Sequence, residues 1–180
     1  MIISLVMISL VASLALGGIY NMTKEPIALA NKAKEESAIK EVLPEFDSLV
    51  SIKVLPEDGK DSMAINRAYK DGVLVGTAVS TYSNTGYGST QIQLMVGFLP
   101  DNVIRNISVV QQNETPGLGT KMKEPKFKDQ FNGKQAGEFK LKVKKDGGQV
   151  DAITAATISS RAFCDAVNRA YQTYRKKGGN

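Results

Sequence analysis

The chain has 180 residues, of which 42% are apolar, and it carries a formal net charge of +5. This length suits one folded domain with a short additional segment. The single cysteine and the lack of histidine exclude Ser–His–Asp and Cys–His nucleophiles and argue against zinc, haem or iron–sulfur sites within the chain. We therefore predict no catalytic residue and no metal site, and any electron transfer by this chain would depend on an organic cofactor.

The first part of the chain is apolar, and residues 1–20 contain no charged side chain. Twenty helical residues extend about 30 Å, the thickness of a bilayer core. We predict a transmembrane anchor over 1–22, a connecting helix over 23–44 and one folded domain over 45–180. A cleaved signal peptide is the alternative, because residues 12–15 include small side chains, but the apolar run is long for a signal sequence.

The distribution of basic residues gives two further expectations. Lys24, Lys32 and Lys34 follow the apolar run and no Lys or Arg precedes it, so the positive-inside rule alone would place the domain in the cytoplasm. Elsewhere the lysines are scattered, and over 139–144 they alternate with apolar residues, as in a strand with one solvent-exposed face. The sequence has no recognised nucleic-acid-binding motif, so we expect no nucleic-acid partner.

The remaining sequence predicts an α+β domain, in which helices pack against an antiparallel sheet. The connecting helix is expected to begin near Thr23 and Pro26 and to end at Leu43-Pro44. The predicted strands, each rich in apolar residues and bounded by turn residues, are 46–55, 64–69, 73–82, 91–98, 103–111 and 139–143. A short helix is expected over 126–131. The last helix is amphipathic, with apolar residues at steps of three and four, namely Phe163, Val167, Ala170, Tyr171 and Tyr174.

The segment 151–160, with the sequence DAITAATISS, places several hydroxyl groups at the start of this last helix. Backbone N–H groups at a helix start have no partner within the helix, and the positive end of the helix dipole attracts anions. A phosphate group held near Thr157, Ser159 or Ser160 is therefore one interpretation. The other is that these hydroxyl groups only cap the helix, as serine and threonine often do.

Asp151, Thr154, Ala156 and Thr157 resemble the flavinylation motif of the FMN-binding domain family, Asp-x-x-Thr-Gly-Ala-Thr. In that family the final threonine carries FMN through a phosphoester bond, so the resemblance implies covalent FMN on Thr157. It also implies that Asp151 belongs to what a separate FMN transferase recognises. This chain has Ala155 where the family usually has glycine, and a methyl group there is compatible with a helical or extended backbone.

A second segment, 114–119 with the sequence ETPGLG, resembles the loop that lies against the flavin in the same family. Its Pro-Gly pair is a turn signal, and its last glycine permits a close approach of the backbone to a flat ring. The segment TGYG at 85–88 is a weaker match. The resemblance implies a cofactor site drawn from all three segments, with the residues Tyr87, Glu114, Thr115, Gly117, Leu118, Gly119, Thr154, Ala156, Thr157 and Ile158.

The size of the chain, its single apolar segment and the junction at 23–26 are most similar to the G subunits of Rnf-type ion-translocating ferredoxin:NAD oxidoreductases. The C subunits of sodium-pumping NADH:quinone reductases are generally longer and rank second. This resemblance implies an electron-relay subunit anchored in the cell membrane, with most of the chain outside the cytoplasm. Its implied partners are the other membrane subunits, especially a multi-span flavin-bearing one, and the FMN transferase.

Two other interpretations stay open at this point. The chain could be a stand-alone FMN electron carrier outside any ion pump, or an anchored binding domain without redox function in which Thr157 only caps a helix. The sequence gives no sign of a nicotinamide or ferredoxin site, which partner subunits would have to provide. We therefore expect no complete enzymatic activity from this chain alone.

Overall fold

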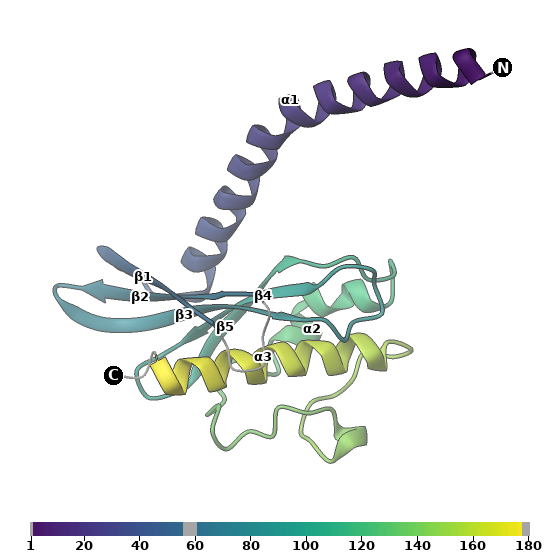
Figure 1. Cartoon of the computed structure of the whole chain (residues 1–180). Helices are drawn as coiled ribbons and strands as arrows, with labels where there is room; N and C mark the ends of the chain where they lie inside the picture. The colour runs from purple at the N-terminus through teal and green to yellow at the C-terminus, as the bar shows by residue number, and fades with distance from the viewer. Residues whose placement is uncertain (1, 56–60, 178–180) are drawn as a thin grey trace. The chain divides into compact units, whose positions relative to one another are not determined.

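The computed structural model describes residues 2–55 and 61–177, and the chain forms two compact units, Met1–Glu36 and Ser37–Asn180. Its first element, helix α1, spans Ile2–Val42 and supplies the whole of the first unit (Figure 1). Within the described residues α1 is the one helix long and apolar enough to cross a membrane, with a mean hydropathy of 2.4 over its most apolar window. Its apolar side chains in the first unit are exposed.

The predicted helix start at Thr23 and Pro26 is wrong, because α1 continues through both residues. The Thr23 hydroxyl does not cap a new helix. It donates to the carbonyl of Ile19, four residues earlier, at 2.8 Å. Serine and threonine often make this back-bond within a helix, and it gives the hydroxyl a hydrogen-bond partner.

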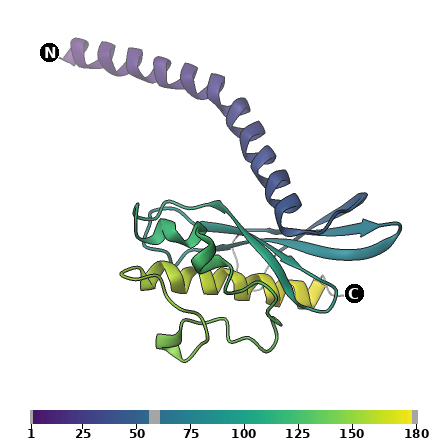
Figure 2. The ribbon, with the colours of Figure 1, turned by 180° about the vertical axis from the view of Figure 1, so that it is seen from behind.

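The second unit is built on one antiparallel sheet (Figure 1, Figure 2). Its strands follow one another in space as they do in sequence, and they are β1 (Ser48–Val54), β2 (Met63–Lys70), β3 (Val73–Ser83), β4 (Ile92–Phe98) and β5 (Ile104–Gln111). Asp71 and Gly72 both have positive φ, 51° and 78°, as the tight β2–β3 turn requires. The predicted α+β class with an antiparallel sheet is confirmed.

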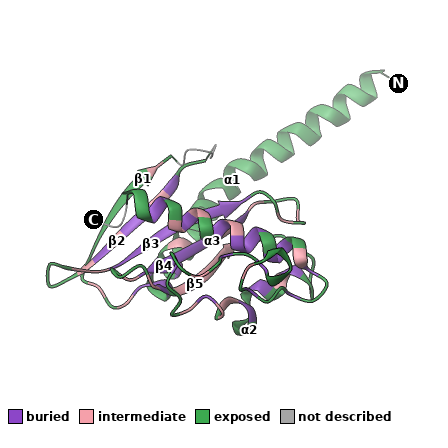
Figure 3. Ribbon diagram, turned by 90° about the horizontal axis from the view of Figure 1, so that it is seen from below, coloured by how far each residue is buried: buried purple, intermediate pink, exposed green. Residues whose placement is uncertain are grey.

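Helix α3 (Thr157–Lys177) covers one face of this sheet, and its apolar stripe forms the main core with β2, β3 and β4 (Figure 3). Phe163, Val167, Ala170 and Tyr174 are all buried, as their spacing predicts. The last turns of α1 pack on the opposite face, where Gly97 lets the helix approach: a Cβ there would lie 2.1 Å from a backbone carbonyl of α1.

The segment predicted as a strand over 139–143 is not a strand. It belongs to a loop on the side of α3 away from the sheet, as both ribbon views show (Figure 1, Figure 2). Leu141 and Val143 are buried in the core without belonging to the sheet, so the alternating pattern reflects packing and not strand pairing. The loop closes on itself, since Gln149 accepts the Lys140 N–H at 2.7 Å.

Among its described residues this unit has three further short helices, and two of them lie between β5 and the loop. These are η1 (Gly119–Lys123), α2 (Pro125–Lys128) and η2 (Lys144–Asp146). The helix predicted over 126–131 is present in shorter form as α2. Together, η1 and α2 lead from the end of β5 to this loop, and the loop leads to the segment that enters α3.

Candidate functional site

A cavity of about 530 Å³ opens where three segments distant in sequence meet. The contributing segments are the 84–91 loop after β3, the 112–119 segment after β5 and the entry into α3. The lining residues are Tyr87, Glu114, Thr115, Leu118, Gly119, Ala155, Ala156, Thr157, Ile158 and Ser159. The fold thus brings together most of the residues that the sequence assigns to a cofactor site, whereas Gly117, Thr154 and Asp151 do not line this cavity.

Glu114 joins all three segments through its buried carboxylate, which is 4% exposed. Its Oε1 accepts the backbone N–H of Gly88 at 3.0 Å, and its Oε2 accepts the hydroxyl of Ser159 at 2.5 Å. Its own backbone N–H donates to the side-chain oxygen of Gln112 at 2.6 Å. The side chain therefore acts as a clamp between the two loops and the first turn of α3.

Three glycines make room for this clamp. A Cβ at Gly86 would lie 2.6 Å from Oε1 of Glu114, and a Cβ at Gly119 would lie 2.7 Å from both Cβ and Oε2 of Glu114. At Gly88 a Cβ would lie 2.2 Å from the carbonyl oxygen of Asn113. In the fold Gly119 makes room for the carboxylate and also lines the cavity, while its predicted close approach to a ring stays a prediction.

The entry into α3 is a tight turn over residues 153–156, closed by the Ala156 N–H donating to the Ile153 carbonyl at 3.0 Å. Ala155 has a φ of 60°, while Thr154 has negative φ, which is the pattern of a type II turn. The third position of such a turn favours glycine, which explains the glycine usual there in the family motif. The backbone at Ala155 is thus neither helical nor extended. The methyl group would be unstrained in either of those two conformations, so Ala155 is strained here.

Ser160 fixes the same turn from inside the helix. Its hydroxyl oxygen accepts the Ile153 N–H at 2.9 Å and donates to the Ala156 carbonyl at 3.0 Å. Both bonds are buried, so the turn cannot open without exposing unpaired polar groups. Thr157 then stands as the first residue of α3, half-buried at the wall of the cavity.

The cavity offers two kinds of contact to a ligand. The first amides of α3 suit an anion, since they have no partners within the helix. Around them stand three large apolar side chains that remain substantially exposed, Tyr87 at 71%, Leu118 at 39% and Ile158 at 47%. A flat aromatic ligand with an anionic tail would use both, the tail at the helix start and the ring against the apolar rim.

The 115–118 turn presents Leu118 to this rim. The Leu118 N–H donates to the Thr115 carbonyl at 3.1 Å, with Pro116 and Gly117 between them and a φ of 74° at Gly117. Proline followed by glycine suits a type II turn. Gly117 is exposed and has open space around its Cβ position, so it shapes the loop without touching the cavity.

Asp151 and Thr154 line a separate, smaller depression of about 180 Å³ on the side of α2. The carboxylate of Asp151 forms an ion pair with Lys144 at 2.8 Å, and both side chains are largely exposed. Its backbone is held by Gln130, a residue that sequence reasoning did not select. The motif thus divides into an upstream half that faces solvent and a downstream half at the cavity.

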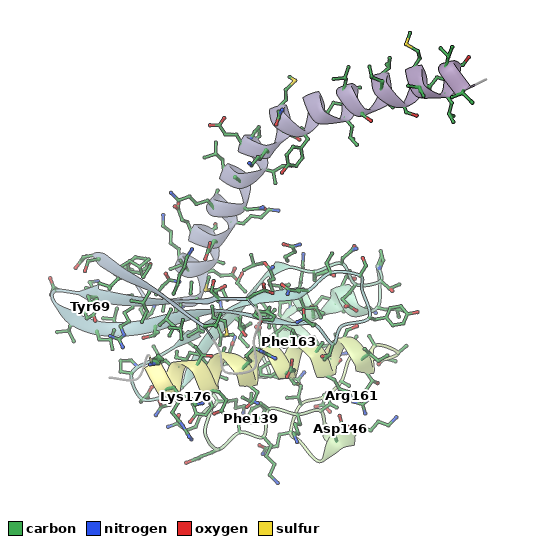
Figure 4. All side chains as sticks on the ribbon, in the orientation of Figure 1. Tyr69, Phe139, Asp146, Arg161, Phe163 and Lys176 are labelled. Carbon is green, nitrogen blue, oxygen red and sulfur yellow. The ribbon has the colours of Figure 1, made fainter. Side chains whose placement is uncertain are left out.

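A bidentate ion pair holds the loop with η2 against α3 close to the cavity. Arg161 donates from Nε and Nη2 to the two carboxylate oxygens of Asp146 at 2.7 and 2.6 Å (Figure 4). The hydrogen bond from Arg161 lowers the pKa of Asp146 below its ordinary value of 3.8, and the same bond raises the pKa of Arg161. Behind them Cys164 is buried, and desolvation raises its pKa to about 12, so it is an inert thiol.

Fold and site together define an FMN-binding domain that follows an apolar helix. Residues 86–172 match the model of the FMN-binding domain family, a range that contains every residue lining the cavity. Among curated proteins, the G subunit of the ion-translocating oxidoreductase complex of Methanosarcina acetivorans is 34% identical over 174 residues, which cover 94% of this chain and 90% of that protein. The G subunit of the Na(+)-translocating ferredoxin:NAD(+) oxidoreductase complex of Acetobacterium woodii is 32% identical over 185 residues, with coverages of 95% and 88%.

The chain therefore belongs to the family of G subunits of ion-translocating oxidoreductase complexes, which confirms the resemblance seen in its motifs. Among solved structures, NqrC of Shewanella oneidensis superposes with a TM-score of 0.51 over 77% of this chain and 72% of that chain. At 20% identity this likeness concerns the fold alone.

Proposed function

We propose that this chain is the electron-relay subunit of a membrane-bound, ion-translocating ferredoxin:NAD oxidoreductase, with FMN attached to Thr157 through a phosphoester bond. The observation that carries the proposal is the place of Thr157, which lines the cavity as the first residue of α3. Its hydroxyl stands where helix-end amides stabilise a phosphate, beside an apolar rim that suits a flavin ring. FMN would supply the redox chemistry, and the chain would bind and orient it.

The segment 151–160 carries four hydroxyl groups, and their surroundings single out Thr157. The Ser159 hydroxyl donates to the carboxylate of Glu114, and Ser160 is fully buried in α3, where its hydroxyl bonds to the preceding turn. Thr154 is exposed but lies outside the cavity. Within the described residues the Thr157 hydroxyl has no hydrogen-bond partner, which leaves it available as a nucleophile.

The charge of the cavity favours covalent over ionic retention of FMN. Among its lining residues there is no lysine or arginine, and the one charged type is glutamate. A free FMN phosphate, with close to two negative charges, would find no counter-ion there. A phosphodiester on Thr157 keeps a single negative charge, which helix-end amides can stabilise.

The attachment would be made by a separate FMN transferase with FAD as donor. The Thr157 oxygen forms a bond to the FMN phosphorus, the pyrophosphate bond of FAD breaks, AMP leaves and the hydroxyl proton is released. In the complex, α1 would be the single membrane anchor and the domain would lie outside the cytoplasm. A multi-span flavin-bearing subunit is the partner that we expect to exchange electrons with it.

The proposal is tested by co-expressing the full chain with an FMN transferase and examining flavin fluorescence after denaturing electrophoresis. The parent and Thr157→Ser should fluoresce, because both carry a hydroxyl group at the site. Thr157→Val, which keeps the shape but not the hydroxyl, should be dark while its thermal unfolding stays near that of the parent. A fluorescent Thr157→Val band would reject Thr157 as acceptor, and a dark parent would favour a binding domain without redox function.

A further inference from the structure

We propose that the buried carboxylate of Glu114 lowers the reduction potential of the flavin that occupies the cavity. This inference rests on the proposed function, since it requires that a flavin binds at this site. It assigns Glu114 a role beyond that of a clamp, namely that of a fixed negative charge at the wall of the cavity.

Glu114 lines the cavity while lying almost entirely out of water, with an exposure of 4%. Its two oxygens accept hydrogen bonds from Gly88 and Ser159, and both donors are neutral. An ionised carboxylate only accepts hydrogen bonds, and both oxygens of Glu114 accept one. No lysine or arginine lines the cavity, and none of the ion pairs among the described residues involves Glu114. Its negative charge is therefore stabilised by neutral hydrogen-bond donors, and no cation among the cavity's lining residues neutralises it.

The position of this charge is fixed by close packing. The Cβ positions of Gly86 and Gly119 both fall within 2.7 Å of Glu114 atoms, so a backbone without side chains encloses the carboxylate. The backbone N–H of Glu114 is itself held by Gln112. The side chain cannot turn toward solvent without losing both of its hydrogen bonds in a buried place, which costs free energy.

A fixed negative charge that is itself buried acts strongly on a neighbouring redox group, since the local dielectric screens it less than water does. Reduction of the flavin takes electrons from an external donor and protons from solvent. Negative charge that accumulates on the ring is repelled by the carboxylate, so the oxidised form is favoured. The protein thereby tunes the cofactor through a charge near the ring.

Glu114→Gln separates this electrostatic role from the clamp. The amide has the same shape and removes only the charge. Its oxygen can accept the Gly88 N–H, and its NH₂ group can donate to Ser159, whose hydroxyl can rotate to accept. Glu114→Asp keeps the charge but shortens the side chain. Glu138→Gln changes the net charge equally at an exposed position that does not line the cavity.

The experiment is a spectroelectrochemical titration of the full, flavin-loaded chain at one pH, with flavin attachment verified by peptide mass and thermal unfolding recorded for each variant. Glu114→Gln should have a more positive midpoint than the parent, with the ratio of reduced to oxidised flavin raised on the order of tenfold at the parent midpoint. Glu138→Gln and Glu114→Asp should stay near the parent.

The possible contrary results are distinguishable. If the flavin-loaded Glu114→Gln variant has the same midpoint potential as Glu138→Gln, the inference is wrong and the proposed function stands. A parent without flavin would overturn both. If Glu114→Gln does not load with flavin, Glu114→Met also removes the charge, and a midpoint equal to that of Glu114→Asp would overturn the inference just as clearly.

Discussion

The side-chain amide of Gln130 forms two hydrogen bonds with the backbone of Asp151. Its Oε1 accepts the Asp151 N–H at 2.8 Å, and its Nε2 donates to the Asp151 carbonyl at 3.2 Å. Gln130 follows α2, so this pair fixes the upstream half of the 151–157 motif to the short helices after β5. The motif is therefore held in a defined shape by a residue twenty-one positions away in sequence.

We predict that Gln130→Ala slows flavin attachment, because a transferase would meet a segment that is no longer held in one conformation. The measurement is the initial rate of FMN incorporation into the purified full chain with transferase and FAD. Gln172→Ala is the matched control, since Gln172 is exposed on α3. Equal initial rates for Gln130→Ala and the parent would show that the two hydrogen bonds from Gln130 are not needed for recognition.

Asp151 itself should act through its exposed carboxylate and not through its ion pair. Asp151→Ala should strongly reduce incorporation, whereas Lys144→Met should leave it near the parent rate. Both variants should unfold close to the parent temperature, because an ion pair with side chains 61% and 68% exposed contributes no more than about 1 kcal/mol. Full incorporation into Asp151→Ala in the same assay would dismiss its role in recognition.

The strained turn before α3 predicts a stabilising substitution. Ala155→Gly should increase the free energy of unfolding by about 1 kcal/mol, because alanine with a φ of 60° pays a steric cost that glycine does not. Urea unfolding of the full chain measures it. Ala152→Gly, at a neighbouring exposed alanine without positive φ, should be neutral or destabilising. A loss of stability in Ala155→Gly equal to that in Ala152→Gly would contradict a strained turn.

The Arg161–Asp146 pair predicts a pH dependence. The folded pKa of Asp146 is lowered, so its contribution to stability is present above its unfolded value of 3.8 and is lost as pH falls through the folded pKa. The unfolding temperature of the parent should therefore exceed that of Asp146→Asn near neutral pH, and the two should converge below about pH 3.8. A constant difference down to the most acid pH tested would argue against a charge-based contribution.

The sequence predicts those features of this fold that depend on local patterning. The five strands, the amphipathic last helix and the two motif segments each follow from apolar spacing and turn residues. The failures have physical causes as well. The alternation over 139–143 matches that of a strand, but its apolar residues pack into the core, and its one pairing is an isolated bridge between Val143 and Val150 outside the sheet. At Pro26 the sequence pattern predicts a helix start, but the residue lies inside α1, which begins upstream.

The parts of the site that the sequence could not predict depend on contacts between distant segments. Nothing local indicates that Glu114 bonds to both Gly88 and Ser159, or that Gln130 holds Asp151. Ala155 is an intermediate case. Its departure from the usual glycine was visible in the sequence, but only the φ of 60° shows why glycine is favoured there.

The most direct test of the central claim is peptide mass spectrometry of the full chain after co-expression with an FMN transferase. We predict one modified peptide, heavier by FMN less one water, with fragment ions that assign the added mass to Thr157. Assignment to Thr154, Ser159 or Ser160, or the absence of any flavin-bearing peptide from correctly folded protein, would contradict the account.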